Sequence, residues 1–193
     1  MRIISGKFKG LKLYSPSNLE VRPTSDRLKE SLFSILSTTK YDIDIINSNV
    51  IDICTGTGAL GIEALSRGAK NIYFVDNEQN SLDIVRKNLS KIKFSNDEKA
   101  NIKIIKADAK KPFKNINIIF NIVLIDPPYN SNIFHSCLQN LKEENLIDFK
   151  SHIFLETSKK EVLELEGFEV LDIKLYGKSK LTILKLSDLS SIK

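Results

Sequence analysis

Residues 49–61, Asn-Val-Ile-Asp-Ile-Cys-Thr-Gly-Thr-Gly-Ala-Leu-Gly, decide the fold. The apolar, β-branched start is typical of a strand buried on both faces, and the glycines that follow favour a tight loop leading into a helix. A second apolar run, residues 71–75, then ends in Asp76. The order strand, glycine loop, helix, strand and acid predicts a nucleoside-binding βαβ unit in a Rossmann-like α/β fold.

The rest of the chain continues this alternation. Apolar runs predict further strands at 102–105, within 116–125 and at 153–156, and helical spacing predicts helices at 27–36, 62–67, 81–92, 132–141 and 159–165. Residues 168–175 and 181–186, joined through Gly177, favour a terminal antiparallel hairpin. We therefore expect a mostly parallel, doubly wound sheet over residues 39–193, preceded by a small basic hairpin or arm and a helix over residues 1–38.

Aspartates mark the first four predicted strands. Asp52 lies inside the first strand, and Asp76, Asp108 and Asp126 follow the next three. Because the carboxyl ends of parallel strands share one edge of the sheet, where ligands bind in open α/β folds, these side chains should line one pocket.

The glycine loop alone does not indicate which nucleoside-containing cofactor binds. Gly56, Gly58 and Gly61 match G-x-G-x-x-G, with Asp76 20 residues after Gly56, so a dehydrogenase that binds a nicotinamide cofactor is one reading. Asp52 counts against it, because a carboxylate there would repel a pyrophosphate. The same charge suits the cationic amino-acid end of S-adenosylmethionine.

S-adenosylmethionine would use the whole series of polar residues. We expect its methionine part to contact Asp52, Thr55, Gly56 and Gly58. Asp76 can accept both ribose hydroxyls, and Asp108 can accept from the adenine amino group. These six residues are the predicted cofactor site.

A second motif, Asp-Pro-Pro-Tyr at residues 126–129, ends the fourth predicted strand. Asp126 and the carbonyl of Pro127 can accept hydrogens from an amino group on a flat ring, while Tyr129 offers its face for stacking. The motif predicts a site for an amino group on a base.

Composition limits the class of protein. The 193 residues, 41% hydrophobic and 27% charged, fit one globular domain. No apolar run approaches the roughly 18 residues of a membrane span, and the start lacks a signal-peptide pattern, so a cytoplasmic protein without membrane contact is expected. Two cysteines and two histidines lack ligand spacing. We expect Cys54 and Cys137 to be reduced core thiols, and no metal site.

The charge is concentrated at the N-terminus. Residues 1–31 carry seven basic and three acidic side chains and supply +4 of the net charge of +5. A basic arm on a nearly neutral body predicts contact with a polyanion, because phosphate neutralisation dominates sequence-independent affinity for nucleic acids. The residues expected to hold RNA near the pocket are Lys7, Lys9, Arg22, Thr24 and Arg27.

Together the motifs at 2–7, 22–27, 52–69 and 126–129 resemble the bacterial family of small-subunit (16S) ribosomal RNA guanine-N2 methyltransferases, class I enzymes that use S-adenosylmethionine. The resemblance implies methylation of a guanine N2 in small-subunit rRNA, within an assembled or assembling subunit, by a monomer. It also implies a catalytic set of Asp126, Pro127 and Tyr129. The chain departs from the family at Cys54-Thr55, where Phe-Ala is usual, and at Lys178, where Asp is frequent.

Other readings stay open. Asp-Pro-Pro-Tyr also resembles the motif of amino methyltransferases that act on DNA adenine or other RNAs, so it indicates the chemistry better than the substrate. A nucleotide-binding module without catalysis, or a dehydrogenase, would bind a dinucleotide and would not depend on Asp126.

Overall fold

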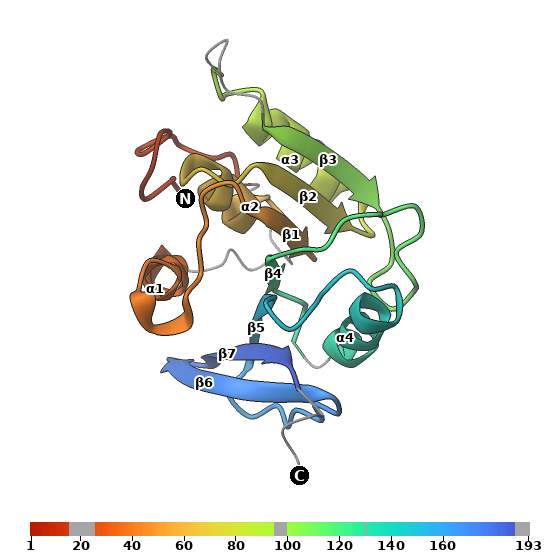
Figure 1. Cartoon of the computed structure of the whole chain (residues 1–193). Coiled ribbons are helices and arrows are strands. Elements are labelled where there is room, and N and C mark those ends of the chain that lie inside the picture. The colour runs from red at the N-terminus through yellow and green to blue at the C-terminus, as the bar shows by residue number, and fades with distance from the viewer. Residues whose placement is uncertain (16–25, 95–99, 130, 188–193) are drawn as a thin grey trace.

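The structure is a computed structural model that describes residues 1–15, 26–94, 100–129 and 131–187. These residues form a seven-stranded sheet in the order β3-β2-β1-β4-β5-β7-β6 (Figure 1). The strands are β1 (Asn49–Ile53), β2 (Asn71–Asp76), β3 (Asn101–Lys106), β4 (Ile122–Ile125), β5 (His152–Ser158), β6 (Phe168–Tyr176) and β7 (Ser179–Leu186). The helices are α1 (Asp26–Leu36), α2 (Ala59–Ser66), α3 (Gln79–Leu89) and α4 (Ile133–Glu143), with a 3-10 turn η1 (Thr39–Tyr41).

The sheet confirms the α/β class. β1 to β5 are parallel, whereas β7 pairs antiparallel with β5 and with β6. The strand order reverses at β1, with β2 on one side and β4 on the other, so the carboxyl ends of β1 and β4 flank a switch point. In open α/β sheets a ligand binds at such a point.

Two cores cover the two faces of the sheet, and successive residues of β1 divide between them. Val50 packs with α1, α2, α3 and the N-terminal segment, while Ile51 and Ile53 pack with α4 and the loop before β4. This double burial explains why β1 reads as a near-continuous apolar run. Asp52 is the polar exception on the α2 side.

The N-terminal segment folds back on itself and docks on α2. Arg2 and Lys12 form an antiparallel bridge. The Glu63 carboxylate of α2 accepts the N–H groups of Ile4 at 2.7 Å and Ser5 at 3.0 Å. The segment is therefore held on the helix that follows the glycine loop.

One predicted helix is wrong. Residues 159–160 form a turn, and residues 161–165 have no regular secondary structure. Leu163 and Leu165 pack on the core beneath α4, whereas Val162 between them is 84% exposed. Exposed and partly buried side chains thus alternate with a period of two, which is not the period of a helix. The other predicted elements are present, with ends shifted by a few residues. No helix in the described parts of the chain is both long and apolar enough to cross a membrane.

Candidate active site

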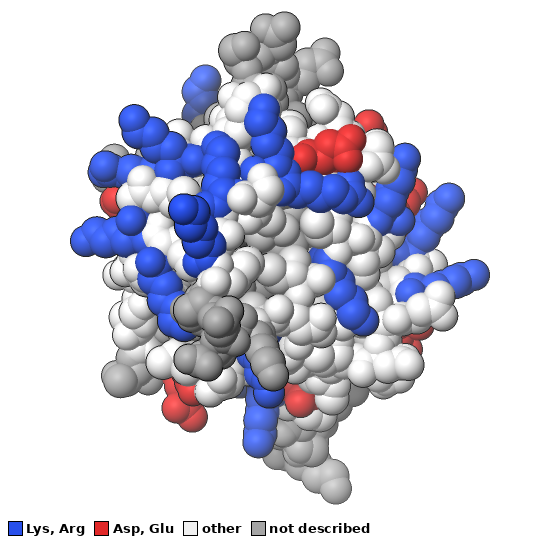
Figure 2. Space-filling view, turned by 90° about the horizontal axis from the view of Figure 1, so that it is seen from above, with Lys and Arg blue, Asp and Glu red and all other residues white. Residues whose placement is uncertain are grey.

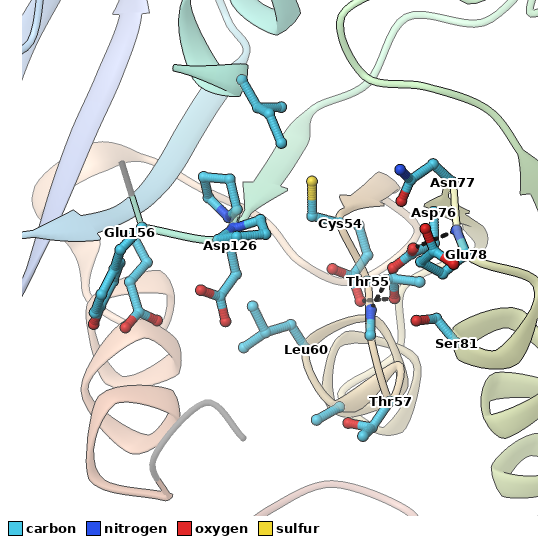
Figure 3. A pocket seen from close by; sticks show the side chains of 17 residues that line it. Cys54, Thr55, Thr57, Leu60, Asp76, Asn77, Glu78, Ser81, Asp126 and Glu156 are labelled. Carbon is cyan, nitrogen blue, oxygen red and sulfur yellow. Dashed lines mark hydrogen bonds between the residues drawn. The ribbon is translucent and has the colours of Figure 1, made fainter. Parts of the chain in front are cut away.

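A cavity of about 380 Å³ opens at the carboxyl ends of β1, β2, β4 and β5 (Figure 3). This volume is within the range of small-molecule sites, roughly 300–1,000 Å³. Of the nine residues predicted for the cofactor and for catalysis, seven line it: Asp52, Thr55, Gly56, Asp76, Asp126, Pro127 and Tyr129. Gly58 lies in the same loop, and Asp108 is not among the lining residues.

Glycines let the loop after β1 close tightly over α2. Gly58 has φ +77°, a left-handed conformation that glycine adopts without strain, and it directly precedes the helix. At Gly61 a Cβ atom would lie 2.4 Å from the ring of Phe74. The third glycine of the motif thus serves close packing of α2 on β2.

Asp52 organises this loop from beneath. Its Oδ2 accepts the Thr55 hydroxyl at 2.7 Å and the Gly61 N–H at 2.8 Å. The residue is 1% exposed, and burial raises the pKa of its carboxyl to about 7, although both hydrogen bonds lower it; the charges of Asp126 and Asp76 raise it further. Asp52 is therefore a loop-positioning residue as well as part of the cavity wall.

Asp76 joins the loop to β2. Its oxygens accept the N–H groups of Gly56 and Glu78, both at 2.9 Å. A carboxylate has about four acceptor positions, so these bonds leave capacity for ligand hydroxyls. Glu78 and Ser81 also line this side of the cavity and were not predicted; their signal was their position just after the acid that ends β2.

Cys54 is a free thiol that packs against the core, as expected, but it is not fully buried. It is half-buried, lines the cavity and has φ +58°, which is uncommon for a residue other than glycine. Burial, and then the surrounding aspartates, raise the pKa of its thiol to about 12. The group is therefore neutral near pH 7 and unsuited to act as a nucleophile. Cys137 is a buried free thiol of α4, as predicted.

The Asp-Pro-Pro-Tyr motif forms the opposite wall. Asp126 follows β4 directly, and its N–H donates to the carbonyl of Ile53 at 3.3 Å, which ties the motif to the end of β1. The Tyr129 hydroxyl hydrogen-bonds Ser179 Oγ at 2.7 Å. Ser179 begins β7 and is 2% exposed, so the terminal strand pair holds the aromatic ring in place.

Glu156 was not among the predicted site residues, although it lines the cavity. It lies in β5, is 6% exposed and follows Leu155, which pairs in register with Ile125 of β4. Its carboxylate and that of Asp126 point to the same side of the cavity (Figure 3). The signal was available, since Glu156 ends the fifth predicted strand as the aspartates end or follow the others.

Asp108 is separate from these groups. It follows β3, and its Oδ1 accepts the N–H of Lys110 at 2.9 Å. Its charge is near enough to contribute to the raised pKa of the Cys54 thiol. Contact between Asp108 and a ligand stays a prediction, and it requires the ligand to extend past the cavity toward β3.

The basic residues lie on a broad surface (Figure 2). Lys7 and Lys9 are exposed, and the Lys7 N–H donates to the Ser66 carbonyl at the end of α2. Because α2 has eight residues, its end at Ser66 lies about 12 Å along the helix from the glycine loop. The turn that carries Lys7 and Lys9 is therefore not at the cavity. Arg22 and Thr24 lie outside the described residues, and of Arg27 only the backbone, in α1, is described.

Two unpredicted lysines of the α3 end extend the basic surface. Lys87 Nζ lies 3.6 Å from the centre of the Tyr14 ring, and Lys91 Nζ donates to the Lys12 carbonyl at 3.1 Å. Their contacts join α3 to the N-terminal segment. The sequence offered no direct signal for them, because an exposed lysine near the end of a helix is ordinary.

Comparison with solved structures supports the fold. The putative methyltransferase yhhF from Escherichia coli superposes with a TM-score of 0.79 at 25% identity, covering 96% of this chain and 97% of that one. The putative methylase HI0767 from Haemophilus influenzae gives 0.74 at 30% identity, covering 97% and 98%. Magnesium protoporphyrin IX methyltransferase from Synechocystis, solved with bound S-adenosylmethionine, shares the fold at 14% identity and a TM-score of 0.58.

Sequence relatives point to the same group. The ribosomal RNA small subunit methyltransferase D of Haemophilus influenzae is 33% identical over 178 residues, which cover 92% of this chain and 89% of the relative. The enzyme of that name in Escherichia coli is 30% identical over 81% of this chain and 74% of its own. A family model described as conserved hypothetical protein 95 matches residues 1–185. With its class I methyltransferase fold, the chain belongs to the conserved hypothetical protein 95 family.

Proposed function

We propose that this protein transfers a methyl group from S-adenosylmethionine to the N2 amino group of a guanine in small-subunit ribosomal RNA. The observation that carries the proposal is the Asp-Pro-Pro-Tyr corner, which faces the glycine loop and its carboxylates across one cavity. Relatives named ribosomal RNA small subunit methyltransferase D, at up to 33% identity, supply the substrate class.

The cavity fits the cofactor by its donor and acceptor set. Asp52 and Asp76 offer carboxylates for an ammonium group and for ribose hydroxyls, and Leu60 and Ile133 add apolar surface. Asp108 would reach the adenine amino group if the ligand extends toward β3. When bound, S-adenosylmethionine supplies a methyl group already activated by its sulfonium.

The residues opposite the loop would prepare the accepting nitrogen. The N2 lone pair of guanine is delocalised into the ring, and this makes the nitrogen a poor nucleophile. Hydrogen bonds from its two hydrogens to Asp126 and to the Pro127 carbonyl would draw it toward tetrahedral geometry. Tyr129, held by Ser179, would stack on the base, a contact worth about 1–3 kcal/mol. The remaining contribution is positioning, because the transfer needs no covalent enzyme intermediate.

The basic surface would hold the RNA while the target base leaves its stack to enter the cavity. Lys7 and Lys9 would contact phosphates, which provide affinity without reading sequence. Arg22, Thr24 and Arg27 are proposed for the same role. Since the lysines lie a helix length from the loop, the RNA should span the molecule from the N-terminal turn to the cavity, as a folded rRNA can. We expect this activity in the cytoplasm, from a monomer.

The test is a methyl-transfer assay in which several candidate substrates are offered in parallel. Purified protein and labelled S-adenosylmethionine are incubated in parallel with unmodified small ribosomal subunits, naked ribosomal RNA and duplex DNA, and the methylated nucleoside is identified after digestion. N2-methylguanosine from ribosomal material is expected. Methyladenine from DNA would replace the proposed substrate with the first alternative. Cofactor binding without any transfer, or dinucleotide binding, would favour a non-catalytic module or a dehydrogenase.

Asp126→Asn separates catalysis from binding in the same assay. The amide keeps the size of the side chain but accepts a hydrogen less strongly, so transfer should fall by about 100-fold or more while cofactor affinity changes little. Equal loss of both would assign Asp126 a structural role instead.

A further inference from the structure

Glu156 occupies the place beside Asp126 on the neighbouring strand. Ile125 of β4 pairs in register with Leu155 of β5, and each is followed by an acid that lines the cavity. Parallel strands lie about 4.8 Å apart, and residues at matching positions face the same side of a sheet. Figure 3 accordingly shows the two carboxylates pointing the same way. A planar ligand with two adjacent hydrogen-bond donors on one edge could donate to both carboxylates.

The cavity is unusually acidic for a site that meets a nucleic acid. Its described lining includes the carboxylates of Asp52, Asp76, Glu78, Asp126 and Glu156 and no lysine, arginine or histidine. Glu156 is 6% exposed, and a hydrogen bond to a carboxylate is electrostatically stronger in such surroundings than in water. The acidic lining therefore selects a ligand edge that donates hydrogens rather than one that accepts them.

Guanine has such an edge and adenine does not. In guanine the atom beside the N2 amino group is N1, which carries a hydrogen. In adenine the atom beside the N6 amino group is also N1, but it bears a lone pair. If one carboxylate takes a hydrogen of the amino group, its neighbour meets a donor in guanine and an acceptor in adenine. A carboxylate facing a lone pair would be repelled and would gain no hydrogen bond from the base.

We propose that Glu156 is the residue that selects guanine: its carboxylate accepts the N1–H of the target base while Asp126 accepts an N2 hydrogen. This inference rests on the proposed function and adds to it the group that distinguishes guanine from other bases with an amino group. A site built around a buried polar pair rejects a base that lacks the matching hydrogen more strongly than an apolar pocket would. The same repulsion disfavours adenine as a substrate.

The first arm of the test uses wild-type protein and two versions of one RNA. The position found methylated is rebuilt by ligation with guanine or with 2-aminopurine, which keeps the N2 amino group but has a lone pair at N1. Loss of a hydrogen bond to a charged group should lower kcat/KM for 2-aminopurine by about 10- to 100-fold. Equal rates on both bases would overturn the role of Glu156, whereas no transfer to guanine N2 would overturn the proposed function itself.

The second arm uses Glu156→Gln, whose amide matches the size of the carboxylate and can either accept from N1–H or donate to an N1 lone pair. The ratio of kcat/KM for guanine over 2-aminopurine should fall toward one. Glu164→Gln, an exposed glutamate outside the cavity, is the matched control and should keep the wild-type ratio. A wild-type ratio in Glu156→Gln would overturn the inference.

A structural role for Glu156 is tested by the same variants. If Glu156 acts in base selection, the cofactor affinity and melting temperature of Glu156→Gln should stay near wild type. A general loss of structure would instead lower both of these and would lower transfer to both bases equally, leaving the ratio of kcat/KM unchanged. If this variant does not fold, Glu156→Asp, which keeps the charge on a shorter side chain, should preserve the preference for guanine at a reduced rate. Loss of the preference in Glu156→Asp with an intact fold would count against the proposal.

Discussion

Asp52→Asn should change how stability depends on pH, because the wild-type carboxyl is buried among groups of like charge. The amide introduced by this substitution would retain an oxygen for the Thr55 hydroxyl and the Gly61 N–H, the two bonds that Asp52 accepts at 2.7 and 2.8 Å. It would not titrate, and it would not carry charge next to Asp126 and Asp76, which raise the pKa of Asp52. The substitution therefore keeps the loop's hydrogen bonds and removes the buried charge.

The magnitude follows from the pKa of the Asp52 carboxyl, which rises from 3.8 to about 7 on folding. The folded state holds this proton more tightly than the unfolded chain does. The protonated carboxyl therefore contributes to the unfolding free energy, and this contribution is fully present below pH 3.8 and is lost as pH rises through about 7. About three pKa units correspond to about 4 kcal/mol. The unfolding free energy of Asp52→Asn minus that of wild type should therefore grow by up to that amount between pH 4 and pH 8.

Urea unfolding of both proteins without cofactor, at several values across that pH range, measures this difference. Asp83→Asn, on the exposed face of α3, is the matched control and should differ from wild type by a small, constant amount. Parallel curves for wild type and Asp52→Asn would refute the reasoning. Cofactor binding supplies a second readout. The affinity of the wild-type protein for S-adenosylmethionine should rise as Asp52 ionises near pH 7, because the carboxylate attracts the cofactor's ammonium group, whereas Asp52→Asn should bind the cofactor weakly at every pH.

Three further changes test the frame of the site. Tyr129→Phe and Ser179→Ala remove the same hydrogen bond, so each should cost about 1 kcal/mol in urea unfolding and the double variant no more than either alone; additive costs would show that the bond is not shared. Gly6→Ala should destabilise by about 1–3 kcal/mol more than Gly10→Ala by thermal unfolding, because only at Gly6 would the Cβ meet the Ser66 carbonyl oxygen, at 1.9 Å, while both glycines have positive φ; equal costs would contradict this. Reversing the charge of Lys7 and Lys9 should weaken RNA binding and flatten its salt dependence in a filter-binding assay, and unchanged binding would remove these lysines from the RNA surface.

The βαβ unit could be predicted because its signals are local. The β-branched run of β1, the glycines after it and the acid that ends β2 lie within 28 residues, 49–76, and each has a direct conformational meaning. For the segment after β5, the same method gave a wrong prediction. Its apolar residues Val162, Leu163 and Leu165 fit a short helix by count, but the two that pack on the core are spaced by two, and which residues are buried depends on tertiary contacts.

The site was predicted for the residues of the Asp-Pro-Pro-Tyr motif and of the βαβ unit, and it was missed at Glu156 of β5. Asp126 and Tyr129 belong to one tetrapeptide, so their proximity needs no tertiary information. Glu156 is brought beside Asp126 by the register of β4 and β5, strands separated by α4. Its position at the end of a predicted strand indicated the correct edge of the sheet, but nothing local specifies that β5 lies next to β4 in this register, because both are set by how the buried faces of the strands pack.

Ser179 shows why the terminal strands belong to the site. A simple meander would place β6 next to β5, but β7 takes that position, and Ser179 pairs with Ser158 at the carboxyl end of β5. That insertion brings the first residue of β7 to the edge where Tyr129 lies, and their hydroxyls meet at 2.7 Å. With β6 adjacent to β5 instead, the residue at that edge would come from the opposite end of the hairpin and the tyrosine would lose this partner. The strand order that looks like a detail of the sheet thus determines how firmly the aromatic ring is held beside Asp126.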